Sequence, residues 1–178
     1  MTDFFQNGII TTLHDLGQRG LESLEGELAA LAQRSPIALV LPCLYSELGT
    51  PALAGIVEKL AKVPYLDHVV IGLDRANAEE FRHALAYFSV LPQRHTVLWQ
   101  DGPRMGAVQE RLAQHGLAPM ERGKGCNVWY CLGYVQAEGR ARAVALHDCD
   151  IVTYERDLLA RLVYPVVHPG FNYRFCKG

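Results

Sequence analysis

From Ile37 onward, short aliphatic runs alternate with longer amphipathic segments. The aliphatic runs predict strands over residues 37–41, 68–73, 95–99, 143–146 and 171–176. The segments between them predict helices over about 51–62, 77–90, 103–116 and 153–162, and one more that carries Val128, Cys131, Leu132 and Val135 on one face and ends at Gly139. Continuous aliphatic strands alternating with helices indicate an α/β fold, with a mostly parallel sheet and helices on both faces.

Residues 1–35 predict an N-terminal helical arm, ahead of an α/β domain over residues 36–178. Thr2 would cap this helix, Gly17 and Gly20 would bend or split it, and Pro36 would end it. One apolar stripe follows from the three-and-four spacing of Leu21, Leu24, Leu28 and Leu31. We expect the stripe to pack on the domain or on a second subunit, so a homodimer through the arm stays open.

Composition narrows the classes of function. With 178 residues the chain fits one domain with a real core, and its net charge of −2 gives no basic surface for nucleic acid. No apolar run is long enough to span a bilayer, and the N-terminus lacks the features of a signal peptide, so we expect a cytoplasmic protein. The five cysteines are odd in number and irregular in spacing, which argues against a zinc site or a disulfide framework.

The tripeptide Asp148-Cys149-Asp150 carries the strongest chemical signal. It follows the aliphatic run 143–146, so it is expected at the carboxyl end of a buried strand. Residues two apart on a strand point the same way, and two carboxylates side by side repel each other unless a hard cation lies between them. The tripeptide therefore predicts a site for a hard divalent cation, although a pair of solvated loop acids would give the same sequence.

Two other strand ends carry polar residues. Residues 42–47 follow the first predicted strand, and Asp74-Arg75 follows the second. Ligands of open α/β sheets bind at the carboxyl ends of the strands, so these clusters are expected to meet beside Asp148. Gly123-Lys124-Gly125, predicted as a loop between two helices, could expose backbone N–H groups and one ammonium to a phosphate, or be a plain surface turn.

Taken in order, these motifs resemble the nucleotide-sugar-dependent glycosyltransferases of the GT-A fold. Within them, the closest likeness is to the retaining group of glucosyl-3-phosphoglycerate synthase and mannosylglycerate synthase-like enzymes. The matching features are a Pro-x-Leu turn followed by an acid (Pro42, Leu44, Glu47), an acid after the second strand (Asp74), a Gly-Lys-Gly segment (123–125), an Asp-x-Asp metal motif (Asp148, Asp150) and the start of a further conserved segment at 171–178. The resemblance covers residues from Ile37 to the end.

This resemblance implies a function and a division of roles. Pro42, Leu44, Glu47 and Asp74 would contact the nucleoside of a UDP- or GDP-hexose donor, and Lys124 its phosphates or ribose. Asp148 and Asp150 would hold Mg²⁺ or Mn²⁺ against the diphosphate, for transfer to a small polar acceptor such as glycerate or phosphoglycerate. The group's remaining histidine ligand and its acceptor site would lie beyond Gly178, so we expect a truncated, donor-binding half that transfers no sugar by itself.

Departures from the group's pattern leave the nucleobase open. The usual Asp-Ser-Gly or Asp-Gly-Ser after the second strand is replaced here by Asp74-Arg75-Ala76, and an "LNEE"-like run by residues 44–47. Donor sugar, acceptor, stereochemical outcome and catalytic residues stay undetermined by the sequence.

Three other interpretations compete. "DCDIV" also fits the motif of haloacid-dehalogenase-type phosphatases, in which Asp148 would be the nucleophile. A sugar-phosphate nucleotidyltransferase would use a similar aspartate, and a non-catalytic interaction module would use the helical arm.

For one histidine and three aromatic residues near the motifs, we weigh packing roles against binding roles. His147 should face away from Asp148 and be packed or hydrogen-bonded. Trp99, Trp129 and Tyr130 could stack a base or a sugar, but Trp129 is expected in the core.

Overall fold

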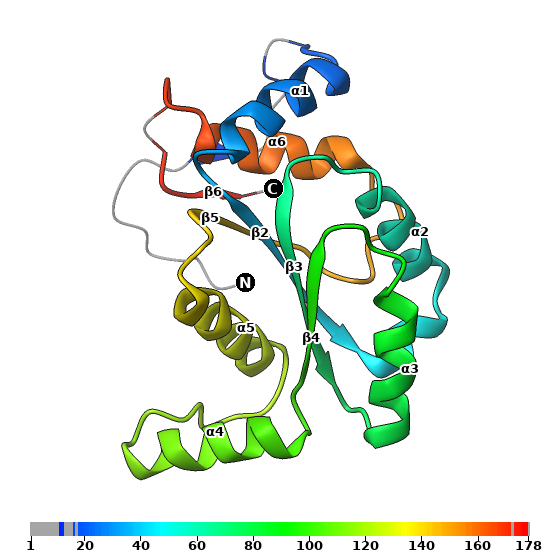
Figure 1. Ribbon diagram of the computed structural model, residues 1–178, viewed down its shortest axis with the longest axis vertical. Helices are drawn as coiled ribbons and strands as arrows, with labels where there is room; N and C mark the ends of the chain where they lie inside the picture. The colour runs from blue at the N-terminus through cyan, green and yellow to red at the C-terminus, as the bar shows by residue number, and fades with distance from the viewer. Residues whose placement is uncertain (1–10, 13–15, 17, 172, 178) are drawn as a thin grey trace.

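A central parallel sheet organises the molecule. The computed structural model describes residues 11–12, 16, 18–171 and 173–177. The sheet has the strand order β4 (Arg94–Trp99), β3 (Leu66–Asp74), β2 (Ile37–Leu44) and β5 (Ala143–Leu146). Figure 1 shows these strands crossing the middle of the molecule with helices on either side. The predicted α/β fold with a parallel sheet covered on both faces is confirmed.

The helices follow the strands in the expected alternation. They are α1 (Leu21–Ala32), α2 (Pro51–Leu60), α3 (Ala78–Phe88), α4 (Pro103–Gln114), α5 (Lys124–Glu138) and α6 (Arg156–Val167), with the 3-10 helix η1 (Tyr45–Gly49) between β2 and α2. Side-chain caps fix two of the starts: the Thr50 hydroxyl accepts from the Leu53 N–H, and the Asn77 side chain accepts from the N–H groups of Glu79 and Glu80. None of the helices among the described residues is long and apolar enough to cross a membrane.

Alternation along the strands divides the core between two faces. Leu39, Leu41 and Cys43 of β2 join the larger cluster, which includes side chains of α1, α2, α3 and α6. Ala38 and Val40 face α5, where they pack with Val70, Cys131 and Val135. On this second face a Cβ on Gly72 would overlap the side chain of Asn127, so glycine lets α5 approach β3 closely.

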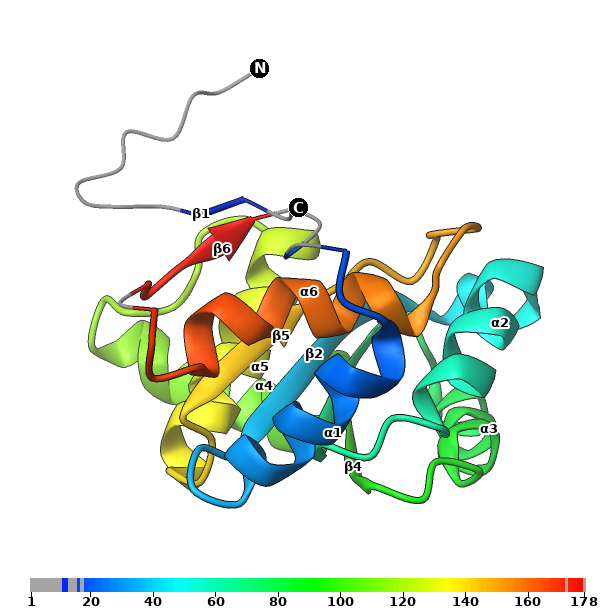
Figure 2. The same ribbon diagram turned by 90° about the horizontal axis from the view of Figure 1, so that it is seen from above.

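Among the described residues of the N-terminal segment, the helix covers a shorter range than predicted. Helix α1 begins after Gly20, its N-cap, while residues 11–12 form a short strand, β1 (Thr11–Thr12). Thr2 and Gly17 lie outside the described residues. Leu24 and Leu28 are fully buried, and α1 lies against α6 in Figure 2. The leucine stripe therefore packs on the domain of its own chain.

Two predicted elements near the C-terminus have different bounds. Helix α6 begins at Arg156 after Glu155 and extends past Leu162 to Val167, so Thr153 does not cap it. The strand predicted over 171–176 shrinks to β6 (Cys176–Lys177), which pairs with β1 outside the main sheet. Just before it, the Phe171 N–H donates to the His168 carbonyl and the two rings are in contact, which closes a turn over residues 168–171.

A buried histidine links three elements. His68 of β3 is 1% exposed; its Nδ1 lies 2.9 Å from Glu138 Oε2 on α5, and its Nε2 lies 2.9 Å from Thr96 Oγ1 on β4. Burial lowers the pKa of His68 below its usual value, and the neighbouring Glu138 carboxylate only partly opposes this. The neutral ring then donates from Nδ1 to the carboxylate and accepts at Nε2 from the threonine hydroxyl.

This arrangement predicts a pH dependence of stability. Because the pKa of His68 is lower in the folded chain than its unfolded value near 6.5, its contribution is complete above about pH 6.5 and is lost as the pH falls below it. His68→Gln should lower the free energy of unfolding at pH 8, and the difference from the natural chain should shrink as the pH falls. Urea titrations at several pH values measure this. A difference that grows toward acid pH would mean that His68 is protonated in the folded chain.

Candidate functional site: a polar cavity at the carboxyl ends of the strands

A cavity of about 300 Å³ opens at the carboxyl ends of β2, β3 and β5. Its lining consists of Pro42, Cys43, Leu44, Glu47, Asp74, Arg75, Gly123, Lys124, Asp148, Cys149 and Asp150. All seven residues that the sequence analysis assigned to a donor or metal site lie in this lining. The structure therefore brings together three strand ends and one helix start that are far apart along the chain.

The strand register explains this convergence. Parallel pairing sets Leu44 of β2 opposite Asp74 of β3, and Val40 of β2 opposite Leu146 of β5. The His147 N–H continues the second ladder by donating to the Val40 carbonyl at 3.1 Å. Two more steps in the same register bring Asp148 to the level of Pro42. Since parallel strands end at one edge of a sheet, their polar ends share one cavity.

Lys124 starts a helix instead of lying in a loop. Gly123 is the N-cap of α5, with φ of 143°, a value that favours glycine, and Lys124 is the first helical residue. The first N–H groups of a helix lack partners within the helix and carry partial positive charge. An ammonium beside such a helix start is suited to binding an anion, and phosphate is the common one.

Asp148 lies next to this helix start. Its Oδ1 is 2.6 Å from Lys124 Nζ, and both side chains are about half exposed, at 45% and 59%. An ion pair in contact with water contributes only about 0–1 kcal/mol, so it opens at little cost when better partners arrive. Asp150 lines the same cavity and is exposed to solvent.

His147 and Cys149, the residues on either side of Asp148, point the other way. His147 is 4% exposed and its Nδ1 lies 3.1 Å from the Tyr154 hydroxyl, which confirms the predicted packed histidine. Burial lowers its pKa to about 4. Cys149 is also buried, at 1% exposure. Alternation thus places His147 and Cys149 inward and leaves the Asp148 and Asp150 side chains on the wetter side.

The rest of the lining is held by short-range hydrogen bonds. Glu47 Oε2 accepts from the Leu44 N–H at 2.6 Å, which ties η1 to the end of β2. Asp74 Oδ1 accepts from the N–H of Arg75, whose φ of 57° is in the left-handed region.

Sequence reasoning missed three residues of the lining as site residues: Arg75, Cys43 and Cys149. The signal for Arg75 was its place beside Asp74 at a strand end. The two cysteines gave no signal from their spacing, because their proximity depends on the register of two strands that are distant in sequence.

The aromatic candidates lie elsewhere. Trp99 stacks on Phe81 with ring centres 4.9 Å apart, and its Nε1 donates to the Ala76 carbonyl, so it has a packing role. The prediction that Trp129 lies in the core is wrong, since it is 45% exposed, whereas its neighbour Tyr130 is buried. Leu132, predicted on the buried face of the same helix, is 42% exposed. Asn127 and Tyr130 are part of the buried face of α5. This buried face is therefore rotated around the helix axis relative to the face predicted from the apolar residues.

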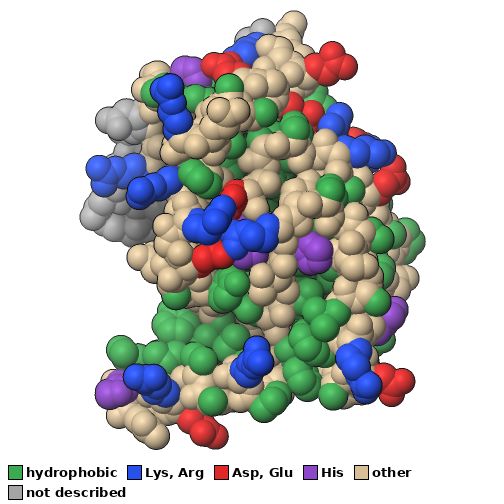
Figure 3. All heavy atoms as spheres, viewed as in Figure 1, with side chains coloured by type: hydrophobic (Ala, Val, Ile, Leu, Met, Phe, Trp, Pro, Cys, Tyr) green, Lys and Arg blue, Asp and Glu red, His purple; other side chains and the backbone are tan. Residues whose placement is uncertain are grey.

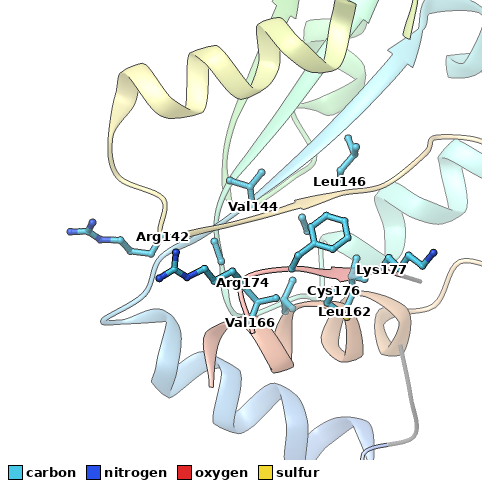
Figure 4. Close-up of a pocket in the computed structure, with 12 residues that line it drawn as sticks. Arg142, Val144, Leu146, Leu162, Val166, Arg174, Cys176 and Lys177 are labelled. Carbon is cyan, nitrogen blue, oxygen red and sulfur yellow. The ribbon is translucent and has the colours of Figure 1, made fainter. Parts of the chain in front are cut away.

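A second cavity has a different character. About 480 Å³ in volume, it runs along β5 toward α6 and residues 174–177, as Figure 4 shows. Val144, Leu146 and Val166 give it an apolar wall, and its charged lining residues are Arg142, Arg174 and Lys177. No carboxylate is among the lining residues, so this cavity lacks the ligands for a hard cation.

The distribution of charged side chains on one face of the molecule agrees with the low net charge of the chain. On the face seen in Figure 3, Lys and Arg side chains stand in small separate groups, some of them beside acidic side chains. That face carries no continuous basic surface.

Comparison with known proteins gives two clear relatives. Over all 178 residues the chain is 47% identical to the glucosyl-3-phosphoglycerate synthase of Persephonella marina. It is 38% identical over 177 residues to the glucosyl-3-phosphoglycerate synthase of Methanococcoides burtonii. The chain spans 44% and 43% of the lengths of these two proteins. No family model matches the chain.

The likeness is not confined to the motifs of the cavity, because it extends over the whole chain. The resemblance predicted from those motifs is thereby confirmed, and nearly the whole chain is similar to part of each of these two glucosyl-3-phosphoglycerate synthases.

Proposed function

We propose that this chain supplies the donor-binding part of a metal-dependent glycosyltransferase. The donor is a UDP- or GDP-hexose, and the acceptor is a small polar molecule such as glycerate or phosphoglycerate. The observation that carries the proposal is the cavity in which Asp148, Asp150 and Lys124 meet the ends of β2 and β3. The names of the two relatives support the reaction class. The phosphatase and nucleotidyltransferase interpretations have no such support.

The carboxylate oxygens of the cavity are suitable ligands for a hard divalent cation. Mg²⁺ is commonly bound by one or two carboxylates, with substrate phosphates and waters completing the shell. Asp148 and Asp150 supply such a pair, and the cavity beside them can admit a diphosphate. When bound, the cation would stabilise the negative charge that develops on the departing nucleoside diphosphate.

Lys124 and Asp148 would change partners when the donor binds. In the free chain, the Asp148 carboxylate balances the positive charge of the Lys124 ammonium. A diphosphate in the cavity offers the ammonium an acceptor of higher charge, and this leaves the Asp148 carboxylate to the cation. Lys124 and the N–H groups at the start of α5 would then hold the phosphates together.

The nucleoside would bind at the ends of β2 and β3, where apolar and charged residues line the cavity together. Pro42, Leu44 and Glu47, at and just after the end of β2, line the cavity beside Asp74 and Arg75 at the end of β3. The Asp74 carboxylate can accept from a ribose hydroxyl or from a base N–H. Calorimetry with UDP-glucose and with GDP-mannose in the presence of Mn²⁺ identifies the donor that this chain binds.

Removing either carboxylate should abolish the effect of the metal. At a ligand concentration of 100 times Kd, binding stabilises the native state by about 2.7 kcal/mol, so UDP or GDP with Mn²⁺ should raise Tm. Asp148→Asn and Asp150→Asn should each remove the part of this rise that requires Mn²⁺. Asp157→Asn, whose carboxylate pairs with Arg161 on α6, is the matched control and should keep it. If both cavity variants respond as the natural chain does, the metal assignment is wrong.

Lys124→Ala should weaken binding of the nucleoside diphosphate by roughly 1–3 kcal/mol, the range for losing a hydrogen bond to a charged group. Binding of free nucleoside should change little, because an ammonium at a helix start binds phosphate. Calorimetry with UDP and uridine, or with GDP and guanosine, measures both. The control is Lys62→Ala, since Lys62 pairs with Glu58 on the surface of the chain. Equal losses for nucleotide and nucleoside would rule out a phosphate contact.

A further inference from the structure

Two cysteines and one glutamate meet at the inner side of the cavity. One ligand atom each of Cys43, Cys149 and Glu47 lies within 4.8 Å of the other two. The two thiols are 1% exposed, and all three residues are part of the cavity lining. These three ligand atoms are close enough together to hold one metal ion. Among the residues that the structure describes, no other group of three or more His, Cys, Asp or Glu side chains is.

The fold fixes this group in place. Cys43 is near the end of β2, and continuing the β2–β5 register by three residues beyond Leu146 sets Cys149 opposite it. Glu47 follows in η1, where its bond to the Leu44 N–H orients the carboxylate. The ligands therefore come from three backbone segments that the sheet and η1 already hold, and little ordering is required when an ion binds.

The chemistry of this group differs from that of the Asp148 and Asp150 pair. Thiolates are soft ligands that select Zn²⁺ and similar cations, whereas carboxylates and waters suit Mg²⁺ and Mn²⁺. Cys149 faces the opposite side of its segment from the two aspartates, so two distinct sets of ligands line one cavity. The hydrogen bond to Cys149 and burial raise the pKa of the Cys43 thiol, which keeps it protonated without an ion.

We infer that Cys43, Cys149 and Glu47 form a Zn²⁺ site with three protein ligands at the inner side of the cavity. Binding displaces the two thiol protons to solvent, and two Zn–S bonds and one Zn–O bond form. Two thiolates and one carboxylate bring three negative charges to the two positive charges of the ion. A fourth position remains toward the cavity for water or another oxygen ligand, as in three-ligand zinc sites.

The inference goes beyond the proposed transfer reaction and does not depend on it. An ion bound here would join β2, η1 and the loop that follows β5, the segments that form the inner side of the cavity. Zn²⁺ should therefore raise Tm, and it should do so in the absence of any nucleotide.

Titration of the reduced, metal-free protein with Co²⁺ tests the site directly. Two thiolate ligands should give a strong thiolate-to-cobalt charge-transfer band, and a near-tetrahedral site should give intense visible d–d bands. One equivalent of Zn²⁺ should remove both signals, and excess Mn²⁺ should not. If the natural chain gives no charge-transfer band, the two thiols serve only as packing and the inference is wrong, whatever any variant does.

Variants then assign the ligands. Cys43→Ser and Cys149→Ser should each weaken Zn²⁺ binding at least tenfold, and Glu47→Gln should do so without altering a buried position. Cys131→Ser, which changes an equally buried thiol beside Asn127, should bind Zn²⁺ as the natural chain does. Asp148→Asn should also keep the cobalt spectrum, so failure of the Mn²⁺ site and failure of this site are separable. A spectrum unchanged in both Cys43→Ser and Cys149→Ser would place the ion elsewhere.

Discussion

The parallel register of β2 with its two neighbours is the constraint on which the site depends. It sets Leu44 beside Asp74 on one side and carries Pro42 and Cys43 toward Asp148 and Cys149 on the other. A shift of one residue would reverse which side chains face α5 and which face the larger core. The carboxylates would then turn inward and the buried His147 and Cys149 would turn toward water. Packing of the aliphatic residues of β2 on both faces therefore determines the geometry of the cavity.

Close packing of α5 on the sheet sets the second half of the site. Gly72 leaves room for Asn127, whose side-chain N–H donates to the Gly72 carbonyl at 2.6 Å. This contact fixes the first turn of α5, and hence the position of Lys124, relative to the strand ends. The first residue of the helix then contacts Asp148 directly, through the Lys124 ammonium. A cationic helix end and two acids are thus held by the same hydrophobic core.

Much of this could be predicted from the sequence. Aliphatic runs bounded by Thr50-Pro51 and Asn77 gave the strands and helices of the first half, because their caps act locally. Asp148 and Asp150 could be placed at a strand end for the same reason. Lys124 was expected in a loop, since Gly123 and Gly125 are poor helix formers, but the tertiary contact at Asn127 holds α5 from Lys124 onward. The proximity of Cys43 and Cys149 could not be predicted, because it depends on which strands are neighbours in the sheet.

The central claim is that the Asp148 and Asp150 carboxylates hold a divalent cation beside the phosphates of a nucleotide. Crystals grown with Mn²⁺ and UDP or GDP would test it through the anomalous scattering of manganese. We expect one anomalous peak within coordination distance of both carboxylates, with the diphosphate on its other side and Lys124 turned to the phosphates. A nucleotide bound in the cavity with no manganese at Asp148 or Asp150, or with manganese bound only elsewhere, would contradict the claim.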